Sequence, residues 1–234
     1  MTETPDCKNC STRLLGVFCH LSDSALGELE KYKTSNTYKK GQLIFYEGNP
    51  SLGLYCIFSG RVKLYKSLSN GSQQILRIAG PGDLLGYRSL FAGENYHASA
   101  ETLEDSNVCY IDPNAFFSIL AKNPDLALSL IKKLAQELRV AENLAVSITH
   151  KPARKRMAEL LLLLKETYGK KVKEGIEISL QLTRQEMAEM IGSTQETSIR
   201  LLSDFKKEKM IKVQERSITI CNLEALLDAA DLEN

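Results

Sequence analysis

Residues 183–205 read TRQEMAEMIGSTQETSIRLLSDF, and the glycine near the middle divides this stretch into two predicted helices. Ala188 in the first helix and Gly192 in the turn lie four positions apart, and both residues are small. Small residues at these positions allow two helices to cross closely, as a helix-turn-helix motif requires. We therefore interpret this stretch as a helix-turn-helix.

Both predicted helices begin with a recognisable pattern. Thr183 with Glu186, and Ser193 with Glu196, have the spacing of a capping box. In that arrangement a hydroxyl and a carboxylate satisfy free amides at the start of a helix. The pattern predicts capping residues at Thr183 and Ser193, with the second helix running from about Thr194 to Phe205.

The sequence on either side of the two helices predicts a wing. Residues 210–213 and 217–221 are expected to form two short strands joined by a turn near Glu215-Arg216. Before the two helices, a longer helix is expected over residues 151–168 and a strand over residues 176–180. Together these elements predict a winged helix-turn-helix.

Positive charge is concentrated in this region. The whole chain has a formal net charge of +1, whereas His150 to Cys221 holds fifteen Lys or Arg against ten Asp or Glu, an excess of five. Such a local excess is typical of regions that contact the phosphates of nucleic acid. An ordinary solvated surface has the same composition, so the charge alone decides nothing.

The sequence before the long helix predicts a sheet of short strands. Between Lys40 and Ile111, glycines separate short runs of alternating or β-branched residues. Residues 62–65 and 75–78 flank Asn70-Gly71, and Asn-Gly between two strands is a strong hairpin signal. Short strands with regular turns favour a barrel or roll. Residues 20–38, before the roll, are expected to be helical.

A long helix is expected between the two regions, from Pro124 to Thr149. Its apolar residues recur at helical spacing and are interpreted as one stripe, which we expect to pair with a second copy of the chain. The predicted fold is α+β, with a jelly-roll domain at 1–123, a dimerisation helix at 124–149 and the winged domain at 150–234. The stripe consists of Leu130, Leu134, Leu138 or Ala141, Ala145 and Ile148.

Composition excludes several other classes of protein. Hydrophobic residues make up 43% and charged residues 25% of the chain, which is ordinary for a folded soluble protein. No stretch approaches the roughly 18 consecutive apolar residues of a membrane span. The N-terminus shows no signal peptide, so a cytoplasmic location is expected. An enzyme is not expected, because no nucleophile–base pair or phosphate loop is found.

These parts, in this order, resemble the CRP/FNR superfamily of transcription regulators over nearly the whole chain. The resemblance implies a cyclic-nucleotide-binding-like β-roll, a homodimer, binding to double-stranded DNA and contact with RNA polymerase. The matching stretches are Lys40-Gly41-Gln42, Glu47-Gly48, residues 59–63, residues 81–86, residues 182–186 and residues 196–202.

The resemblance also implies which residues face DNA. The second helix would enter the major groove with Glu196 and Arg200 as base readers, since a carboxylate can accept from cytosine N4 and a guanidinium can bind guanine O6 and N7. Ile199 stands where relatives have a small residue, and it either touches a thymine methyl or packs inward. A palindromic site with TGA and TCA halves is expected. The remaining candidate contacts are Arg184, Gln185, Thr194 and Gln195.

The sensor region departs from the members that bind cyclic nucleotides. Those members hold phosphate with a Gly-Glu pair and an Arg-Ser or Arg-Thr pair. Here Tyr87 or Arg88 occupies the glutamate position, and His97-Ala98 occupies the second pair. Because the ribose acceptor and the phosphate fork are both missing, cyclic AMP bound in the usual way is not expected. The candidate effector pocket, open to another small ligand, comprises Gly86, Tyr87, Arg88, Ser89, His97 and Ala98.

The cysteines indicate a different signal. The FNR branch carries an oxygen-sensing iron–sulfur cluster on several N-terminal cysteines and one cysteine inside the roll. Here Cys7, Cys10 and Cys19 precede the roll, and Cys109 falls at the internal position. Four thiolates could hold a [4Fe–4S] cluster. Eight residues separate Cys10 from Cys19, which is longer than the FNR spacing.

Three interpretations of the cysteines remain open. They hold a redox-labile cluster, they form a thiol–disulfide switch or zinc site, or they bind no cofactor. Cys56 is expected to be a core thiol and Cys221 a wing thiol. The predicted function is therefore a transcription regulator switched by redox state or oxygen. The alternatives are a regulator gated by a small ligand without metal, and a cyclic-nucleotide-binding-type module that regulates a protein partner.

Overall fold

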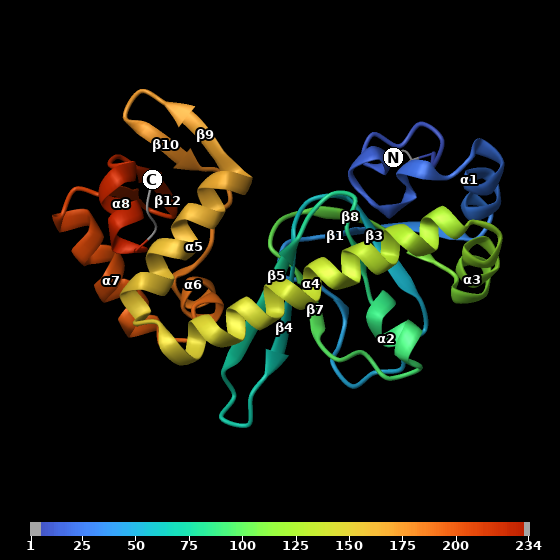
Figure 1. The fold of residues 1–234 in the computed structure, drawn as a ribbon, viewed down its shortest axis with the longest axis horizontal. Helices are drawn as coiled ribbons and strands as arrows, with labels where there is room; N and C mark the ends of the chain where they lie inside the picture. The colour runs from blue at the N-terminus through green and yellow to red at the C-terminus, as the bar shows by residue number, and fades with distance from the viewer. Residues whose placement is uncertain (1–5, 232–234) are drawn as a thin grey trace. The chain divides into compact units, whose positions relative to one another are not determined.

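The computed structural model describes residues 6–231 (Figure 1). The chain forms two compact units that divide between Val140 and Ala141, inside the long helix α4 (Pro124–His150). The first unit contains a β-roll, and the second contains a helix-turn-helix with a wing. The predicted α+β fold with these three parts is therefore confirmed.

Two four-stranded sheets form the roll. The first has the strand order β1-β8-β3-β6 and the second has the order β2-β7-β4-β5, and every pairing is antiparallel. A core with buried side chains from both sheets, among them Ile57 and Val62, holds the sheets together. The strands are β1 (Lys33–Tyr38), β2 (Leu43–Phe45), β3 (Leu54–Ser59), β4 (Val62–Ser67), β5 (Gln73–Ala79), β6 (Leu84–Leu85), β7 (Ser99–Thr102) and β8 (Ser106–Ile111).

The β4–β5 hairpin turns at Asn70-Gly71, as the sequence predicts. The amide of Ser72 donates to the side-chain oxygen of Asn70 at 3.0 Å. The amide of Leu68 donates to the carbonyl of Ser72 at 2.8 Å and closes the turn. Gly71 has a φ of 80°, a backbone conformation that glycine adopts without strain. The local turn chemistry therefore sets the register of the hairpin.

The helix predicted over residues 20–38 is wrong in its second half. Helix α1 covers Asp23–Glu30, and Lys33–Tyr38 is strand β1, which pairs with β8. The residues from Thr34 to Thr37 are polar or β-branched, which weakens a helix and suits a strand. Pairing with β8 supplies the hydrogen bonds that a continued helix would otherwise make.

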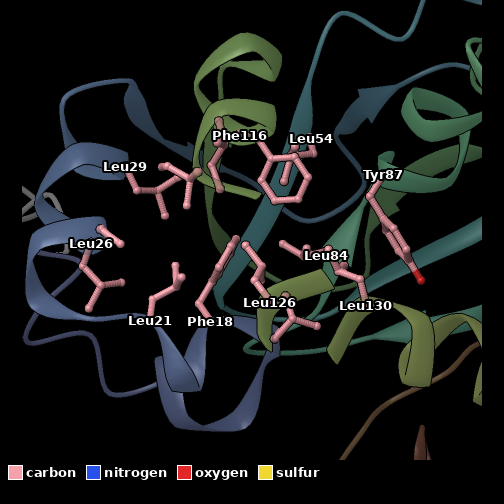
Figure 2. Close-up of a cluster of buried hydrophobic side chains, with 14 residues drawn as sticks. Phe18, Leu21, Leu26, Leu29, Leu54, Leu84, Tyr87, Phe116, Leu126 and Leu130 are labelled. Carbon is pink, nitrogen blue, oxygen red and sulfur yellow. The ribbon is translucent and has the colours of Figure 1, made fainter. Parts of the chain in front are cut away.

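A second buried core joins the N-terminal helices to the roll (Figure 2). It draws side chains from the short 3-10 helix η2 (Val17–His20), from α1, from α3 (Pro113–Lys122) and from the first turns of α4. This core ties the start of α4 to the same packing that fixes the N-terminal segment. Its largest members include Phe18, Leu26, Leu29, Leu54, Leu84, Phe116, Leu126 and Leu130.

Helix α4 has two apolar sides rather than the single predicted stripe. Leu130 is buried and Leu134 packs beside it in the core of the roll. Ile131 and Leu138 are both 60% exposed, on another side of the helix. The prediction was wrong in placing Leu130 and Leu138 on one stripe, because each of the two sides has its own apolar set.

Besides the end of α4, the described part of the second unit holds four helices and one small sheet of order β11-β12-β10-β9. The predicted strands of the wing are confirmed, whereas β9 was not predicted. Among residues 6–231, no helix has the length and apolar character needed to cross a membrane. The elements are α5 (Ala153–Tyr168), β9 (Gly169–Val172), β10 (Gly175–Ile178), α6 (Arg184–Met190), α7 (Gln195–Lys207), β11 (Ile211–Gln214), β12 (Ser217–Ile220) and α8 (Leu223–Ala229).

Candidate nucleic-acid interface and sensor sites

The crossing of α6 and α7 is built as the sequence predicts. Ala188 is fully buried, Gly192 has a φ of 60°, and the amide of Ser193 donates to the carbonyl of Ala188 at 2.9 Å. Arg156 of α5 donates to the carbonyl of Ile191 at 2.7 Å and to that of Gly192 at 3.3 Å. The sequence analysis did not identify this arginine, whose hydrogen bonds hold the turn between α6 and α7.

The two helix starts differ from each other. Thr183 and Glu186 form the predicted capping box at the start of α6. At the start of α7 the cap is Thr194, whose hydroxyl accepts from the amide of Thr197 at 3.2 Å. The box predicted for Ser193 and Glu196 is therefore wrong by one residue. Glu196 therefore does not take part in capping the start of α7.

Helix α7 separates cleanly into a buried and an exposed side. Ser198 and Phe205 are fully buried, and Leu201 and Leu202 are buried beside them in the unit. Ile199 is 50% exposed, so it does not pack inward. The exposed side at the start of the helix consists of Gln195, Glu196, Ile199 and Arg200, which we call the reading face.

The charged groups of the reading face are free to bind a ligand, as far as residues 6–231 show. Within residues 6–231, neither the carboxylate of Glu196 nor the guanidinium of Arg200 has a hydrogen-bond or ion-pair partner. Glu196 can accept from a base amine, Arg200 can donate a fork of hydrogen bonds, and Ile199 between them can contact a methyl group. This chemistry fits the edges of base pairs in a major groove.

Two predicted contacts of α6 are engaged locally. Arg184 donates to the carbonyl of Glu215 in the wing turn at 3.3 Å, and burial lowers the pKa of its guanidinium. Gln185 is exposed and donates to Glu189 at 2.8 Å. Arg184 thus connects the start of α6 to the turn of the wing.

The predicted effector residues gather around helix α2 (Tyr87–Ala92). Nε2 of His97 lies 2.9 Å from the guanidinium of Arg88, and Nδ1 lies 2.9 Å from the hydroxyl of Ser89. Burial, with the positive charges of Arg88 and other basic side chains, lowers the pKa of His97. Gly86 caps α2 with a φ of 78°, and Ala98 is buried.

An acidic residue that the sequence reasoning missed completes this region. The carboxylate of Glu137, on α4, lies 3.2 Å from Arg77, 3.7 Å from Arg88 and 3.8 Å from Lys133. Burial and this carboxylate both raise the pKa of the buried Tyr87 phenol. Glu137 lies far along the chain from the pocket residues, so spacing in the sequence gives no signal for it.

The four cysteines that lie around one cavity are not the four that the sequence predicts as a group. One cavity of about 40 Å³ is lined by Cys7, Cys10, Cys56 and Cys109. Cys19 does not line it, whereas Cys56, expected to be an ordinary core thiol, does. We call this space, which also has Lys33 and apolar side chains in its wall, the cysteine cavity. Cys221 is exposed after β12, as expected of a wing thiol.

Burial favours the protonated form of the thiols in the cysteine cavity. Burial raises the pKa of Cys7 and of Cys109, and the ammonium group of Lys33 opposes the rise at both. Burial, followed by the neighbouring thiols, raises the pKa of Cys56. A bound metal would therefore have to displace protons.

The cavity does not present a site for a single ion. In the described part of the chain, no three histidine, cysteine, aspartate or glutamate side chains are grouped to hold a metal ion. A structural zinc ion requires ligands that converge on one point. An iron–sulfur cluster binds its thiolates at separate irons, so four thiols around a cavity fit its donor requirement in number and in chemistry.

Comparisons with known proteins identify the two parts of the chain. Residues 35–123 match the family model "Cyclic nucleotide-binding domain", and residues 155–229 match "Crp-like helix-turn-helix domain". The fumarate and nitrate reduction regulatory protein of Escherichia coli K12 is 30% identical over 226 residues, covering 96% of this chain and 90% of that protein. A CRP-like cAMP-activated global transcriptional regulator of Mycobacterium tuberculosis H37Rv is 29% identical over 211 residues, or 90% and 94% of the two chains.

Solved structures share the same architecture. FixK2 from Bradyrhizobium japonicum superposes with a TM-score of 0.76 at 27% identity, covering 86% of this chain and 99% of that chain. A CooA mutant from Carboxydothermus hydrogenoformans gives 0.73 at 27% identity, covering 90% and 91%. A sensory roll, a long helix and a winged helix-turn-helix define a class of DNA-binding regulators. The chain belongs to the CRP/FNR family of transcription regulators.

Proposed function

We propose that the chain acts as a homodimer that reads a palindromic DNA site and changes its DNA affinity in response to redox state or oxygen. The reading face of α7 carries the DNA part of this proposal. The cysteine cavity carries the sensing part, because four thiols around one space are a donor set for a redox-active group.

The reading face supports recognition of specific bases. Glu196 and Arg200 are exposed and unpaired within residues 6–231, and Ile199 stands between them. Such groups match cytosine N4, guanine O6 and N7, and a thymine methyl, respectively. We expect half-sites of the TGA and TCA type, with Gln195 and Thr194 as further contacts and with RNA polymerase as the partner on the promoter.

The exposed side of α4 supports a dimer. Leu128, Ile131 and Leu138 are 55%, 60% and 60% exposed and lie on one side of the helix, at spacings of three and seven residues. An apolar stripe of this kind is costly to leave in water. Pairing of two such helices would place two reading faces on half-sites about one helical turn, roughly 34 Å, apart.

A physical route joins the cysteine cavity to α4. Cys7 and Cys56 pack against the core that contains Leu126 and Leu130, the first buried residues of α4. A change in what fills the cavity would therefore alter the packing of the start of this helix. Because half-site spacing depends on how the two α4 helices pair, a small rotation changes DNA affinity.

The iron–sulfur interpretation fits the residues present better than a cyclic nucleotide does. An iron–sulfur cluster, when bound by thiolates, supplies a redox-active centre. In the candidate effector pocket, the carboxylate of Glu137 already lies beside the guanidinium groups of Arg77 and Arg88. These are the cations that an anionic ligand would need.

The proposal is tested by purifying the protein without air and measuring its iron and acid-labile sulfide. Sequences bound from a random duplex library are then determined before and after exposure to air. We expect iron and sulfide in the anaerobic protein, a palindromic consensus, and a change in affinity that accompanies the loss of iron. Iron-free protein that binds the same consensus equally with and without air would contradict the sensing part alone.

A further inference from the structure

The register of the first sheet places two cysteines side by side. Cys56 on β3 is directly opposite Cys109 on β8, and Cys109 is directly opposite Ser35 on β1. Residues opposite each other in an antiparallel pair point to the same face, and so do residues two apart along a strand. Lys33, two positions from Ser35, therefore shares this face with both thiols.

The N-terminal segment covers that face with two more thiols. Cys7 and Cys10 line the same cavity as Cys56 and Cys109. The sulfur of Cys10 lies 3.1 Å from the hydroxyl of Thr12, and the amide of Arg13 donates to the carbonyl of Cys10 at 3.2 Å. The segment is thus held locally by its own turn.

Cys19 is held away from the cavity by its neighbours in η2. Val17 and Phe18 are both buried in the core of the first unit, and Phe18 lies edge-on to Phe116 at 6.4 Å between ring centroids. A Cβ on Gly16 would lie only 2.2 Å from the carbonyl oxygen of Gly82, so the backbone is fitted tightly to the roll at this point. Bringing Cys19 into the cavity would require this packing to be broken.

The lining supplies a compensating charge for bound thiolates. Lys33 has a side chain that is only 6% exposed, and its ammonium group lies 3.6 Å from the carboxylate of Glu30. A thiolate donor set is negatively charged, so a buried cation in the same wall stabilises it.

We propose that Cys7, Cys10, Cys56 and Cys109 form one thiolate centre for an iron–sulfur cluster, and that Cys19 is not a ligand. This inference rests on the sensing part of the proposed function and names the ligands of that site. It departs from the set of Cys7, Cys10, Cys19 and Cys109 that the sequence predicts. Cys56 is the ligand that the spacing of the N-terminal cysteines does not reveal.

The ligand set is tested by anaerobic reconstitution of the full chain with ferrous iron and sulfide. Wild type is compared with Cys19→Ala, Cys56→Ala and Cys221→Ala, the last being a matched control on an exposed thiol outside the cavity. We expect Cys19→Ala and Cys221→Ala to bind iron and sulfide as wild type does, and Cys56→Ala to lose most of both. Loss of iron in Cys19→Ala, or full retention in Cys56→Ala, would overturn the assignment.

A second measurement does not depend on the folding of a variant. The wild-type protein is labelled with a maleimide before and after reconstitution, and labelling at Cys19 is quantified by mass spectrometry. We expect Cys19, which is partly exposed, to react equally in both states. Protection of Cys19 by reconstitution would overturn the assignment. Wild-type protein that takes up no iron would instead sink the sensing proposal and the inference together.

Discussion

The carboxylate of Glu137 lies 3.2 Å from the guanidinium of Arg77, and this pair joins helix α4 to strand β5. Arg88 and Lys133 lie within 4 Å of the same carboxylate. The side chain of Glu137 is only 14% exposed, so water screens these interactions weakly. Glu137 therefore lies beside three cations of the first unit, of which Lys133 also pairs with Asp83 at 2.7 Å.

Removing the charge of Glu137 should destabilise the first unit. In Glu137→Gln the cations lose their common partner while the side-chain volume is kept, and breaking such a buried pair costs about 3 kcal/mol. Tyrosine fluorescence during urea unfolding reports on this unit, because eight of the nine tyrosines lie before residue 140. Glu142→Gln, an exposed residue on the same helix, should change stability by less than about 0.5 kcal/mol. Equal effects of the two substitutions would contradict the role of the cluster.

The stability of the first unit should fall as the pH is lowered through the titration of His97. Burial and the charges of Arg88, Lys66 and Arg77 hold the pKa of His97 below its ordinary value of 6.5. The unfolded chain therefore takes up its proton at a higher pH than the folded chain. The contribution is present above pH 6.5 and is lost as the pH falls from there towards the lowered pKa.

This pH dependence is measured as the free energy of unfolding at about pH 7.5 and about pH 5.5, on either side of the ordinary histidine pKa. His97→Gln keeps a polar group in the same place but removes the titrating group. We expect wild type to lose more stability over this interval than His97→Gln does. Identical losses in the two proteins would show that other groups, such as carboxylates, account for the pH dependence.

The sequence predicted the elements whose signals are local. The Asn70-Gly71 hairpin, the Thr183 capping box and the close crossing at Ala188 and Gly192 each depend on a few adjacent residues, and each is confirmed. The end of α1 was misjudged, because the residues after it suit a strand and the pairing of β1 with β8, a contact between distant segments, supplies the hydrogen bonds of that strand. Local sequence patterns therefore did not predict the element that is fixed by pairing between distant segments.

The same limit applies to the candidate sites. The residues of the reading face were named in advance from the family resemblance, and in the structure they lie on the exposed side of α7. Glu137 and Cys56 could not be named in advance, because each reaches its site from an element remote in sequence from the other members. Only the register of β3 against β8 brings Cys56 to Cys109.

The exposed apolar side of α4 should be the dimer contact. Leu138→Glu places a charge on that side, where desolvating it would oppose pairing, and we expect a monomer with weak DNA binding. Val140→Glu is the matched control, because Val140 is 58% exposed on the opposite side of the helix. Light scattering after size-exclusion chromatography measures the oligomeric state of both variants. A monomer in both variants, or a dimer in both, would contradict this assignment of the contact side.

The cap of α7 should depend on Thr194 and not on Ser193. Thr194→Ala removes the hydroxyl that accepts from the amide of Thr197, and loss of such a cap costs about 1 kcal/mol. Ser193→Ala removes a side chain with no hydrogen-bond partner in the described residues, so little change is expected. Thermal unfolding followed by circular dichroism compares them. A larger loss in Ser193→Ala would restore the capping box that the sequence predicts.

Arg200 and Ile199 should affect DNA binding in different ways. Arg200→Lys keeps the positive charge but removes the fork that binds guanine O6 and N7, so specific binding should weaken by about 1–3 kcal/mol while binding to random DNA changes little. Ile199→Ser removes an apolar contact and should relax the preference at a single base pair only.

Selection from a random duplex library separates these two effects, because it reports the preference at every position of the site. A flattened guanine position in Arg200→Lys, with the other positions intact, is the expected result. The salt dependence of binding should stay as steep as in wild type, since the number of phosphate contacts is unchanged. If Arg200→Lys instead weakened specific and random DNA equally, Arg200 would be a phosphate contact. The exposure of Glu196, Ile199 and Arg200 on one side of α7 would then reflect contact with the backbone rather than with bases.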